Sequence, residues 1–246
     1  MSSELYVALS GAIGRLHELD VTANNLANAD TVGFKRVRGT FSAALEAATR
    51  DMQGERIPGD PAEVFAVLGS PRVDLASGPV ERTGSPLDVA LEGDGFFVVA
   101  GPQGPLFTRA GSFVIGPDGN LATPDGLPVE GASGPIAVGT RPVSIVATGD
   151  VVAEDGEIIG RLRVVDFPEA AALVPDGGNR LRAEGALPTD VENPRVLEGS
   201  LERSNVRPVE EMAALVELQR SFDIVMRSIQ ADADLSERLL REVSGQ

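Results

Sequence analysis

The sequence predicts an α+β protein in which long N- and C-terminal helices pair as a coiled-coil-like inner domain around a mainly antiparallel β domain. Two observations lead to this class. Residues 69–200 hold 21 of the 28 glycines and 14 of the 17 prolines, a density of turn formers that is typical of many short strands. On both sides of that window, apolar residues recur at the spacing of a helix.

The first 26 residues predict a helix that ends near Asn24. Ser2 or Ser3 can cap its start, and Glu4 falls in the first turn, where the helix dipole favours an anion. Asn and Gly residues after position 23 tolerate the left-handed conformation that ends helices. The apolar positions alternate at spacings of four and three, which is a heptad pattern: Leu5, Leu9, Ala12, Leu16, Leu19, Ala23 and Leu26.

The C-terminal residues repeat this design. Pro208 suits the first helical position, and Glu210 and Glu211 follow in the first turn. A helix with one exposed apolar stripe is marginal in water, so both helices need partners, either each other or neighbouring subunits. We therefore predict an assembly seam made of these apolar side chains: Leu5, Leu9, Leu16, Leu19 and Leu26 from the first helix, and Leu215, Leu218, Phe222, Val225 and Ile229 from the second.

Between the helices, the sequence predicts a connector and then strands. We expect residues 1–35 and 204–246 to form the helical inner domain, residues 36–78 a partly extended connector with a short helix at 42–49, and residues 79–203 the β-rich outer domain. Residues 87–91 alternate as a half-buried strand, residues 95–99 form the next strand, and residues 106–108 and 113–115 form another pair. Five Asp-Gly dipeptides are candidates for hairpin turns.

Composition argues against catalysis, cofactors and metal sites. The chain has no Cys and one His, so thiolate chemistry and His-pair metal sites are excluded. His17 flanks the first seam, and no Rossmann, P-loop or calcium-loop pattern is complete. A net charge of −16 argues against binding to nucleic acid, and residues 51–200 account for −13 of this net charge. Residues 35–38 are the one basic group, which we expect at a surface or a contact between subunits.

Two other function classes stay open at this stage. The carboxylates can supply the pair that a secreted β-domain wall hydrolase needs, although spacing does not identify which acids are adjacent. A carbohydrate-binding module usually needs exposed aromatic side chains, and this sequence has only one Tyr and no Trp. The sequence contains no run of about 18 apolar residues, so it does not predict a membrane-spanning helix. The N-terminus lacks a basic region ahead of a hydrophobic stretch, so we expect no Sec-type signal peptide.

Three motifs resemble those of the flagellar rod and hook family. Residues 23–36 resemble its N-terminal signature, A-N-N-L-A-N, two residues, T, one residue, G-F-K, with a departure at Asp30. Residues 83–99 with 107–113 resemble its central motif, and residues 201–212 with 220–222 its C-terminal motif. The residues that match the first signature are Asn24, Asn25, Leu26, Ala27, Asn28, Thr31, Gly33, Phe34 and Lys35.

This resemblance implies a structural subunit of the flagellar rod, not an enzyme. Family members pair their terminal helices in an inner tube and carry the β-rich domain outside it. The implied partners are further copies, other rod subunits and the flagellar export apparatus, with ring proteins or peptidoglycan as further candidates. The implied location is the periplasmic rod of the basal body, reached by export without a cleaved signal peptide. The short length and residues 5–11 resemble proximal rod proteins, with distal rod proteins as the alternative.

Overall fold

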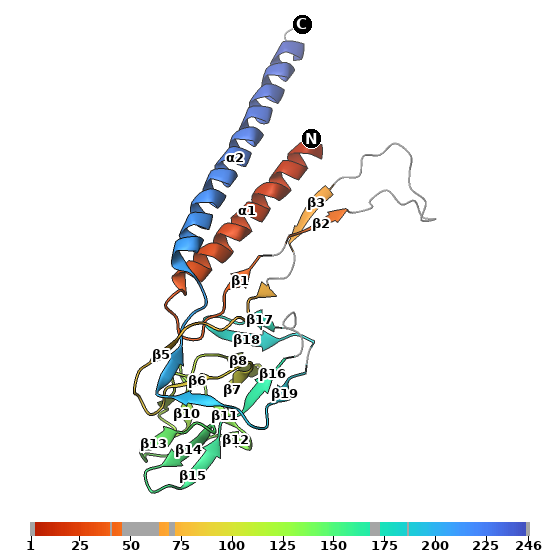
Figure 1. Ribbon diagram of the computed structural model, residues 1–246. Helices are drawn as coiled ribbons and strands as arrows, with labels where there is room; N and C mark the ends of the chain where they lie inside the picture. Colours follow the sequence, from red (N-terminus) through yellow and green to blue (C-terminus); the bar gives the residue numbers. More distant parts are fainter. Residues whose placement is uncertain are drawn as a thin grey trace, which may run out of the picture. The chain divides into compact units, whose positions relative to one another are not determined.

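The computed structural model describes residues 3–39, 41–45, 64–68, 72–167, 173–185 and 187–244, which form two helices and short strands (Figure 1). The helices are α1 (Ser3–Ala27) and α2 (Pro208–Ser244). The strands are β1 (Val37–Arg38), β2 (Phe41–Leu45), β3 (Val64–Leu68), β4 (Arg72–Val73), β5 (Val80–Arg82), β6 (Val89–Leu91), β7 (Phe96–Gly101), β8 (Gly104–Thr108), β9 (Val114–Ile115), β10 (Leu121–Ala122), β11 (Glu130–Gly131), β12 (Gly134–Pro135), β13 (Val143–Ile145), β14 (Asp150–Ala153), β15 (Ile158–Arg161), β16 (Val164–Asp166), β17 (Leu173–Pro175), β18 (Arg180–Ala183), β19 (Thr189–Asp190), β20 (Val196–Glu198) and β21 (Ser200–Glu202).

The chain divides into two compact units. The first contains Met1–Asn24, Gly39–Pro71 and Pro208–Gln246, and the second contains Asn25–Arg38 and Arg72–Arg207. We call the second the β unit and residues 25–38 within it the arm. The arm carries the last residues of α1, a turn and β1, so the chain enters the β unit before α1 has ended.

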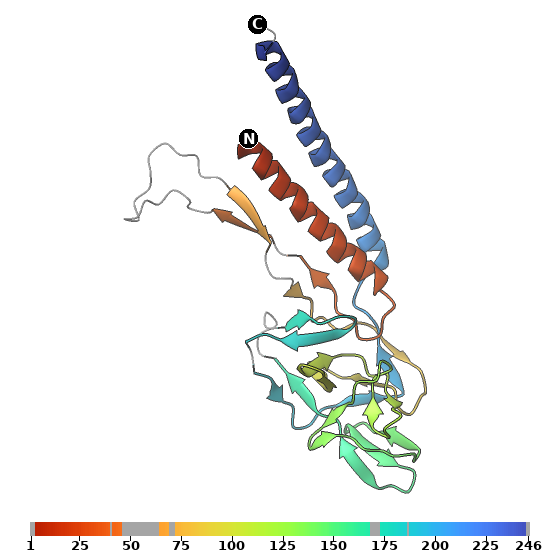
Figure 2. The ribbon, with the colours of Figure 1, turned by 180° about the vertical axis from the view of Figure 1, so that it is seen from behind.

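Both predicted helices are confirmed, and they lie side by side in the two ribbon views (Figures 1 and 2). Pro208 is the first residue of α2, with Glu210 and Glu211 in its first turn. Within the described residues, neither helix has an apolar run long enough to cross a membrane. Pairing of the two helices as a coiled coil stays a prediction.

The β unit is built around an antiparallel six-stranded sheet with the strand order β17-β18-β8-β7-β16-β19. Side chains alternate along β7, so Phe97 and Val99 enter one core cluster and Phe96 and Val98 enter another. The sheet is therefore buried on both faces, which explains why β7 is an unbroken apolar run. A three-stranded sheet, β13-β14-β15, lies at the end of this unit opposite β17 and β18 (Figure 1).

Three predictions about short elements were wrong, two about strands and one about a helix. Residues 106–108 and 113–115 do not pair with each other, because β8 pairs with β7 and β18 whereas β9 pairs with β10. Residues 89–91 are buried throughout, not on one face only. The helix expected at residues 42–49 is a strand over residues 42–45, which belong to β2 and pair with β3. Its Ser-Ala-Ala-Leu sequence suits a helix locally, but strand pairing overrides a weak propensity. Residues 46–49 lie outside the described part.

Asp-Gly dipeptides form three of the hairpin turns in the β unit. Gly119 joins β9 to β10, Gly156 joins β14 to β15, and Gly177 joins β17 to β18, with φ values of 77°, 84° and 84°. A glycine in the left-handed conformation is common near the end of short hairpin loops that are longer than two residues. The prediction that several of the five dipeptides form hairpins is confirmed.

Candidate assembly site

The three family-like motifs meet at a cluster of buried charges formed by Lys35, Arg109 and Glu202. The Lys35 ammonium donates to Glu202 Oε1 at 2.7 Å, and the Arg109 guanidinium lies 3.4 Å from Glu202 Oε2. Each side chain is at most 2 % exposed. Lys35 lies in the N-terminal motif, Arg109 in the central motif and Glu202 in the C-terminal motif. Residues 167 and 93 positions apart are therefore joined at one point.

Backbone groups supply further hydrogen bonds to this charge cluster. Lys35 also donates to the carbonyl of Ala76 at 2.8 Å, and Arg109 donates to the carbonyl of Gly93 at 2.7 Å. The amide of Gly78 donates to Glu202 Oε1 at 2.9 Å. The Glu202 carboxylate thus accepts from a lysine, an arginine and a backbone amide, which offsets the cost of taking its charge out of water.

Burial determines the electrostatics of the two cations. It lowers the pKa of Lys35 below its usual value of 10.5, because desolvation penalises the ammonium more than the nearby Glu202 carboxylate stabilises it. Desolvation likewise lowers the pKa of Arg109, which lies 5.4 Å from the centre of the Phe96 ring. The cluster carries two positive charges and one negative charge. Within the described part of the chain, removing Glu202 would leave two buried cations with no anion within hydrogen-bonding distance.

Glycines allow the segments around the cluster to approach closely. A Cβ on Gly33 would lie 2.2 Å from the amide nitrogen of Ala110, and one on Gly78 would lie 2.0 Å from the carbonyl oxygen of Arg203. Gly33 also has a φ of 67°, and its amide donates to the carbonyl of Glu202 at 2.8 Å. The contacts of Gly33 with Ala110 and of Gly78 with Arg203 are therefore backbone against backbone, where any larger residue would push the segments apart.

Asparagine side chains hold the rest of the arm. Asn25, which is buried, pairs with both backbone groups of Val37, since its amide nitrogen donates to the carbonyl at 2.8 Å and its oxygen accepts from the amide at 2.9 Å. Asn205 accepts from the amide of Arg36 at 2.7 Å. Asn179 donates to the carbonyl of Val32 at 2.8 Å. These amides satisfy backbone groups that no regular sheet reaches.

The motif residues differ in where they lie. Gly33, Phe34 and Lys35 are buried, and so is Asn25. Asn24 and Ala27 are exposed, whereas Leu26, Asn28 and Thr31 are intermediate, with the Thr31 hydroxyl donating to the Asn28 side chain at 3.1 Å. The expectation of a basic surface group at residues 35–38 is wrong for Lys35, because Glu202 draws its ammonium into the core. Arg38 is exposed and pairs with Asp74 at 2.7 Å.

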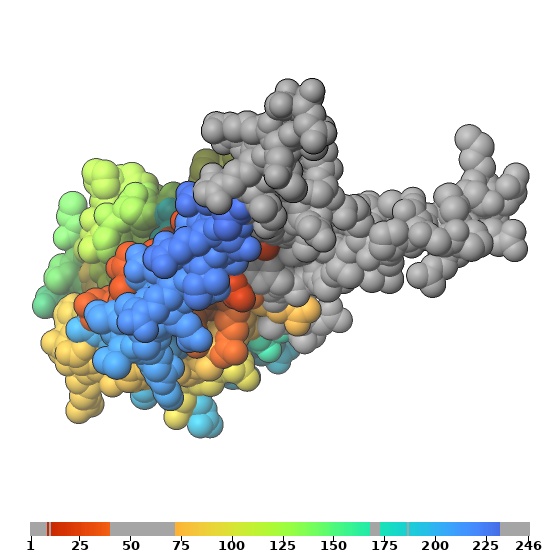
Figure 3. Space-filling view, turned by 90° about the horizontal axis from the view of Figure 1, so that it is seen from above, coloured from red at the N-terminus to blue at the C-terminus, as the bar shows by residue number. Residues whose placement is uncertain are grey.

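The predicted assembly seam is only partly covered within the single chain. Leu9 and Leu16 are 48 % and 50 % exposed. Half-buried positions are Leu19, Leu26, Leu215, Leu218, Phe222, Val225 and Ile229. Leu5 has its backbone in α1, but its side chain lies outside the described part. Figure 3 shows the described part of α2 in blue at the surface of the molecule. That these side chains form an assembly seam stays a prediction.

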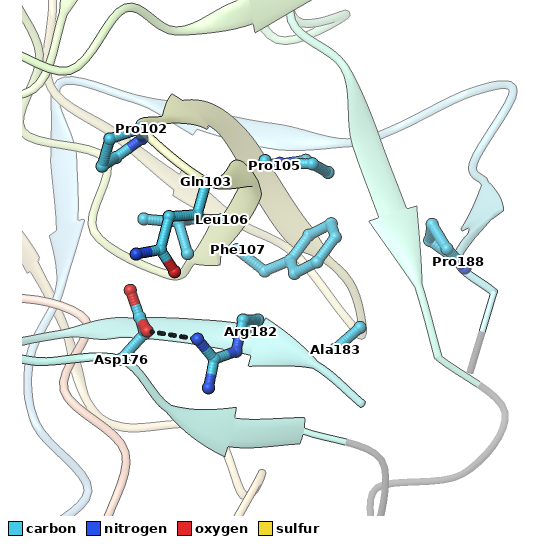
Figure 4. Close-up of a pocket in the computed structure, with 10 residues that line it drawn as sticks. Pro102, Gln103, Pro105, Leu106, Phe107, Asp176, Arg182, Ala183 and Pro188 are labelled. Atoms are coloured by element: carbon cyan, nitrogen blue, oxygen red, sulfur yellow. Dashed lines mark ion pairs between the residues drawn. The ribbon is translucent and has the colours of Figure 1, made fainter. Parts of the chain in front are cut away.

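A hollow in the β unit bears on the hydrolase alternative. It has a volume of about 410 Å³ and lies between the turn joining β7 to β8 and the β17–β18 hairpin (Figure 4). Phe107 and Leu106 line it, with one carboxylate, Asp176, which pairs with Arg182 at 3.3 Å. Glycoside hydrolysis needs two carboxyl groups across one cleft. This hollow supplies one, and an arginine already neutralises it.

Comparison with known proteins gives three family models that match in chain order. The model described as "Flagella basal body rod protein" matches residues 5–35. "Flagellar hook protein FlgE/F/G D1 domain" matches residues 90–160, and "Flagellar basal body rod FlgEFG protein C-terminal" matches residues 197–242. Each model therefore contains one member of the charge cluster.

Curated relatives match over nearly the whole chain. The flagellar basal-body rod protein FlgF of Caulobacter vibrioides is 33 % identical over 239 residues, which is 96 % of each chain. FlgF of Salmonella typhimurium is 34 % identical over 93 % of each chain. FlgG of Agrobacterium fabrum is 32 % identical over 89 % of this chain and 91 % of its own. On these full-length similarities, the chain belongs to the family of flagellar basal-body rod proteins.

Proposed function

We propose that this chain is a FlgF-like subunit of the bacterial flagellar basal-body rod, which polymerises with itself and other rod subunits into a hollow shaft that transmits torque. The observation that carries the proposal is the full-length similarity to proteins named FlgF, which covers 93–98 % of this chain in three such relatives. The convergence of all three motifs on one buried cluster supports it further, because it accounts for those motifs within a single fold.

The apolar faces of α1 and α2 are the surfaces that assembly would cover. Leu9 and Leu16 leave about half of their surface in water, together with Ile13 beside them. Each large apolar side chain gains roughly 1.5–3 kcal/mol on full burial. A head-to-tail contact that does not close into a ring produces a helical polymer. Copies that bury these faces against one another would therefore extend along an axis.

The proposed role is geometric and needs no cofactor, metal or catalytic residue. The buried ionisable residues of the charge cluster pair with one another and with backbone carbonyls, leaving no room for substrate between them. A perturbed pKa in a cleft points to catalysis, whereas a perturbed pKa inside a closed ion-pair network is structural. We therefore do not propose the wall hydrolase.

A test of the seam uses cells that lack this chain and receive full-length variants. Leu218→Glu places a charge on the half-buried stripe of α2, and Gln219→Glu places the same charge on the exposed neighbour. We expect the first variant to be absent from purified basal bodies and to leave cells non-motile. The control should assemble normally. Equal incorporation of both would contradict the seam.

We propose the proximal position, which the similarity to FlgF supports, and the distal rod is the alternative because FlgG relatives are 27–32 % identical over similar lengths. Electron microscopy of intact rods with a tagged chain distinguishes the two. A tag beside the smaller rod subunits on the cell-proximal side supports the proximal position. A tag among the subunits adjoining the hook supports the distal one.

Export without a cleaved signal is part of the proposal, as are contacts with the export apparatus and with ring proteins or peptidoglycan. N-terminal sequencing of the chain from purified basal bodies tests the export route. We expect the mature chain to begin at Met1 or Ser2. A start several residues further along would contradict export without cleavage.

A further inference from the structure

The arm is held by residues that lie far downstream in the chain. The Gly33 amide and the Lys35 ammonium both bind Glu202, and the Arg36 amide binds Asn205. The Val32 carbonyl accepts from Asn179. We propose that Glu202 is a positioning residue, and that the charge cluster is a latch that docks the arm only after β21 has folded. This inference concerns docking within one chain and stands apart from the proposal about the rod.

The chemistry of the cluster favours specificity over strength. Burying an ion pair usually contributes little net stability, since desolvation cancels most of the attraction, but a buried pair excludes wrong partners. Lys35 is the only lysine of the chain, and its neighbours in sequence are Phe34 and Arg36. A slip by one residue in one direction would bring Phe34 opposite the Glu202 carboxylate. A slip in the other direction would bring Arg36 there and leave Lys35 buried without an anion. The latch therefore fixes which residue of the arm lies on β21.

The latch also makes docking conditional on a complete β unit. Arg109 follows β8, and Glu202 is the last residue of β21, the final strand before α2. The N-terminal part of the chain is made first, so Glu202 and Asn205, which bind Gly33, Lys35 and Arg36, become available only after the rest of the β unit has been made. We infer that the arm is the last segment of the β unit to dock. Consequently, it is the segment that opens while the core strands stay folded.

Lys35 supplies its own reporter, because it carries the only side-chain amine in the chain. An acetylating reagent such as acetyl-N-hydroxysuccinimide reacts with an exposed amine and not with one buried against a carboxylate. Trypsin cuts after Lys35 only when it is unmodified, so digestion gives a peptide ending at residue 35 or at residue 36. Mass spectrometry of the full-length chain then measures the acetylation rate of Lys35, with the N-terminal amine as the internal reference.

The decisive variant is Glu202→Gln, which keeps the shape and removes the charge. We expect acetylation of Lys35 to become at least about tenfold faster, a larger change than the accompanying fall in the urea midpoint accounts for, since the variant also leaves Arg109 buried without its anion. Glu198→Gln is the matched control, since Glu198 is exposed on the neighbouring strand β20, and its rate should equal that of the natural chain. Glu202→Asp, which restores the charge, should give an intermediate rate. An unchanged rate in Glu202→Gln would overturn the proposal.

A measurement on the unmutated chain covers the case in which Glu202→Gln does not fold. Hydrogen exchange of the Gly33 and Arg36 amides, bonded to Glu202 and Asn205, reports opening of the arm, and exchange of the Val98 amide, bonded to Arg163 in the core, reports opening of the sheet. We expect the arm amides and the Lys35 amine to share one opening constant, larger than that of Val98. If all of them open together with the core, the arm is not a separate latch and the proposal fails.

Discussion

Gly33 is the residue at which the arm crosses the loop after β8, and it combines two constraints. Its φ of 67° disfavours any side chain, and a Cβ would lie 2.2 Å from the amide nitrogen of Ala110. We predict that Gly33→Ala lowers the free energy of unfolding by about 3 kcal/mol or more, since a strained backbone costs about 1–3 kcal/mol before the steric clash is added. Urea unfolding of the full chain followed by circular dichroism measures this loss.

Gly84 separates the two contributions. It has a similar φ of 76°, but nothing lies within 4 Å of its Cβ position. Gly84→Ala should therefore cost only the conformational part, about 1 kcal/mol. A loss as large as that of Gly33→Ala would mean that backbone strain alone explains both variants, and that the close approach at Ala110 is unimportant.

Asp150 gives the protein an acid-sensitive contact. Its carboxylate accepts from the Arg161 guanidinium at 2.6 and 3.2 Å and from the Thr148 hydroxyl at 2.6 Å. The Arg161 hydrogen bond is the main cause that lowers the pKa of Asp150 below 3.8. The folded chain therefore releases this proton more readily than the unfolded chain. The stabilisation is complete above pH ~4 and is lost as the pH falls through the lowered pKa.

Asp150→Asn tests this dependence. At pH 7 we expect the variant to lose about 1 kcal/mol of unfolding free energy, because Arg161 is nearly half exposed and solvent screens the pair. The difference from the natural chain should shrink progressively as the pH falls below 4. Urea titrations at several pH values measure it. A difference that stays constant with pH would show that packing, and not charge, is what Asp150 contributes.

At the scale of residues, the charge cluster shows which contacts a sequence can predict and which it cannot. Lys35 is conspicuous as the only lysine, yet its neighbours Arg36 and Arg38 suggested a solvated basic group. Periodicity identifies partners within an element, whereas Glu202 lies 167 residues away and was one of 37 acidic residues. The motif resemblance did include Lys35, Arg109 and Glu202. It gave them no common role, because a motif does not show which segments meet.

At the scale of elements, the arm determines how many N-terminal residues can be removed while the β unit stays folded. Removing residues 1–30 would delete Asn25, which pairs with Val37 inside the β unit. We predict that removing residues 1–24 leaves the β unit folded. Removing residues 1–38 should lower its thermal midpoint by several degrees, because Glu202 and Arg109 then lose Lys35 and Gly33. Thermal unfolding of both shortened chains, each with α2 retained, measures the difference.

The long periodic elements were predictable, and the short ones were not. The helices follow from seven-residue patterns and from Pro208 with its acidic first turn. The Asp-Gly hairpins follow from turn chemistry. Strands β1, β4, β9 and β19 have two residues each, too few for any period to show. Their positions are set by partners such as Val73, which lies opposite Val37, and not by their own sequence.

At the scale of the whole molecule, charge is shared by the two units. The β unit has 14 Lys and Arg against 21 Asp and Glu, a net charge of −7, so the remaining 96 residues carry the other −9. The net charge of −13 on residues 51–200 therefore does not make the helical unit neutral. Copies that bring their helices together must overcome repulsion between like charges, and the gain must come from apolar surface.

The balance between apolar burial and charge repulsion predicts how self-association responds to salt. Raising the ionic strength from about 20 mM to about 300 mM shortens the Debye length from roughly 20 Å to below 10 Å and screens the repulsion. We expect the weight-average mass of the full chain, measured by sedimentation equilibrium at fixed protein concentration, to rise with salt. A chain of residues 25–207, which lacks nearly all of α1 and all of α2, should stay monomeric throughout. If added salt instead weakened the association of the full chain, complementary charges would hold the copies together, and the apolar faces of α1 and α2 would not be the assembly surface.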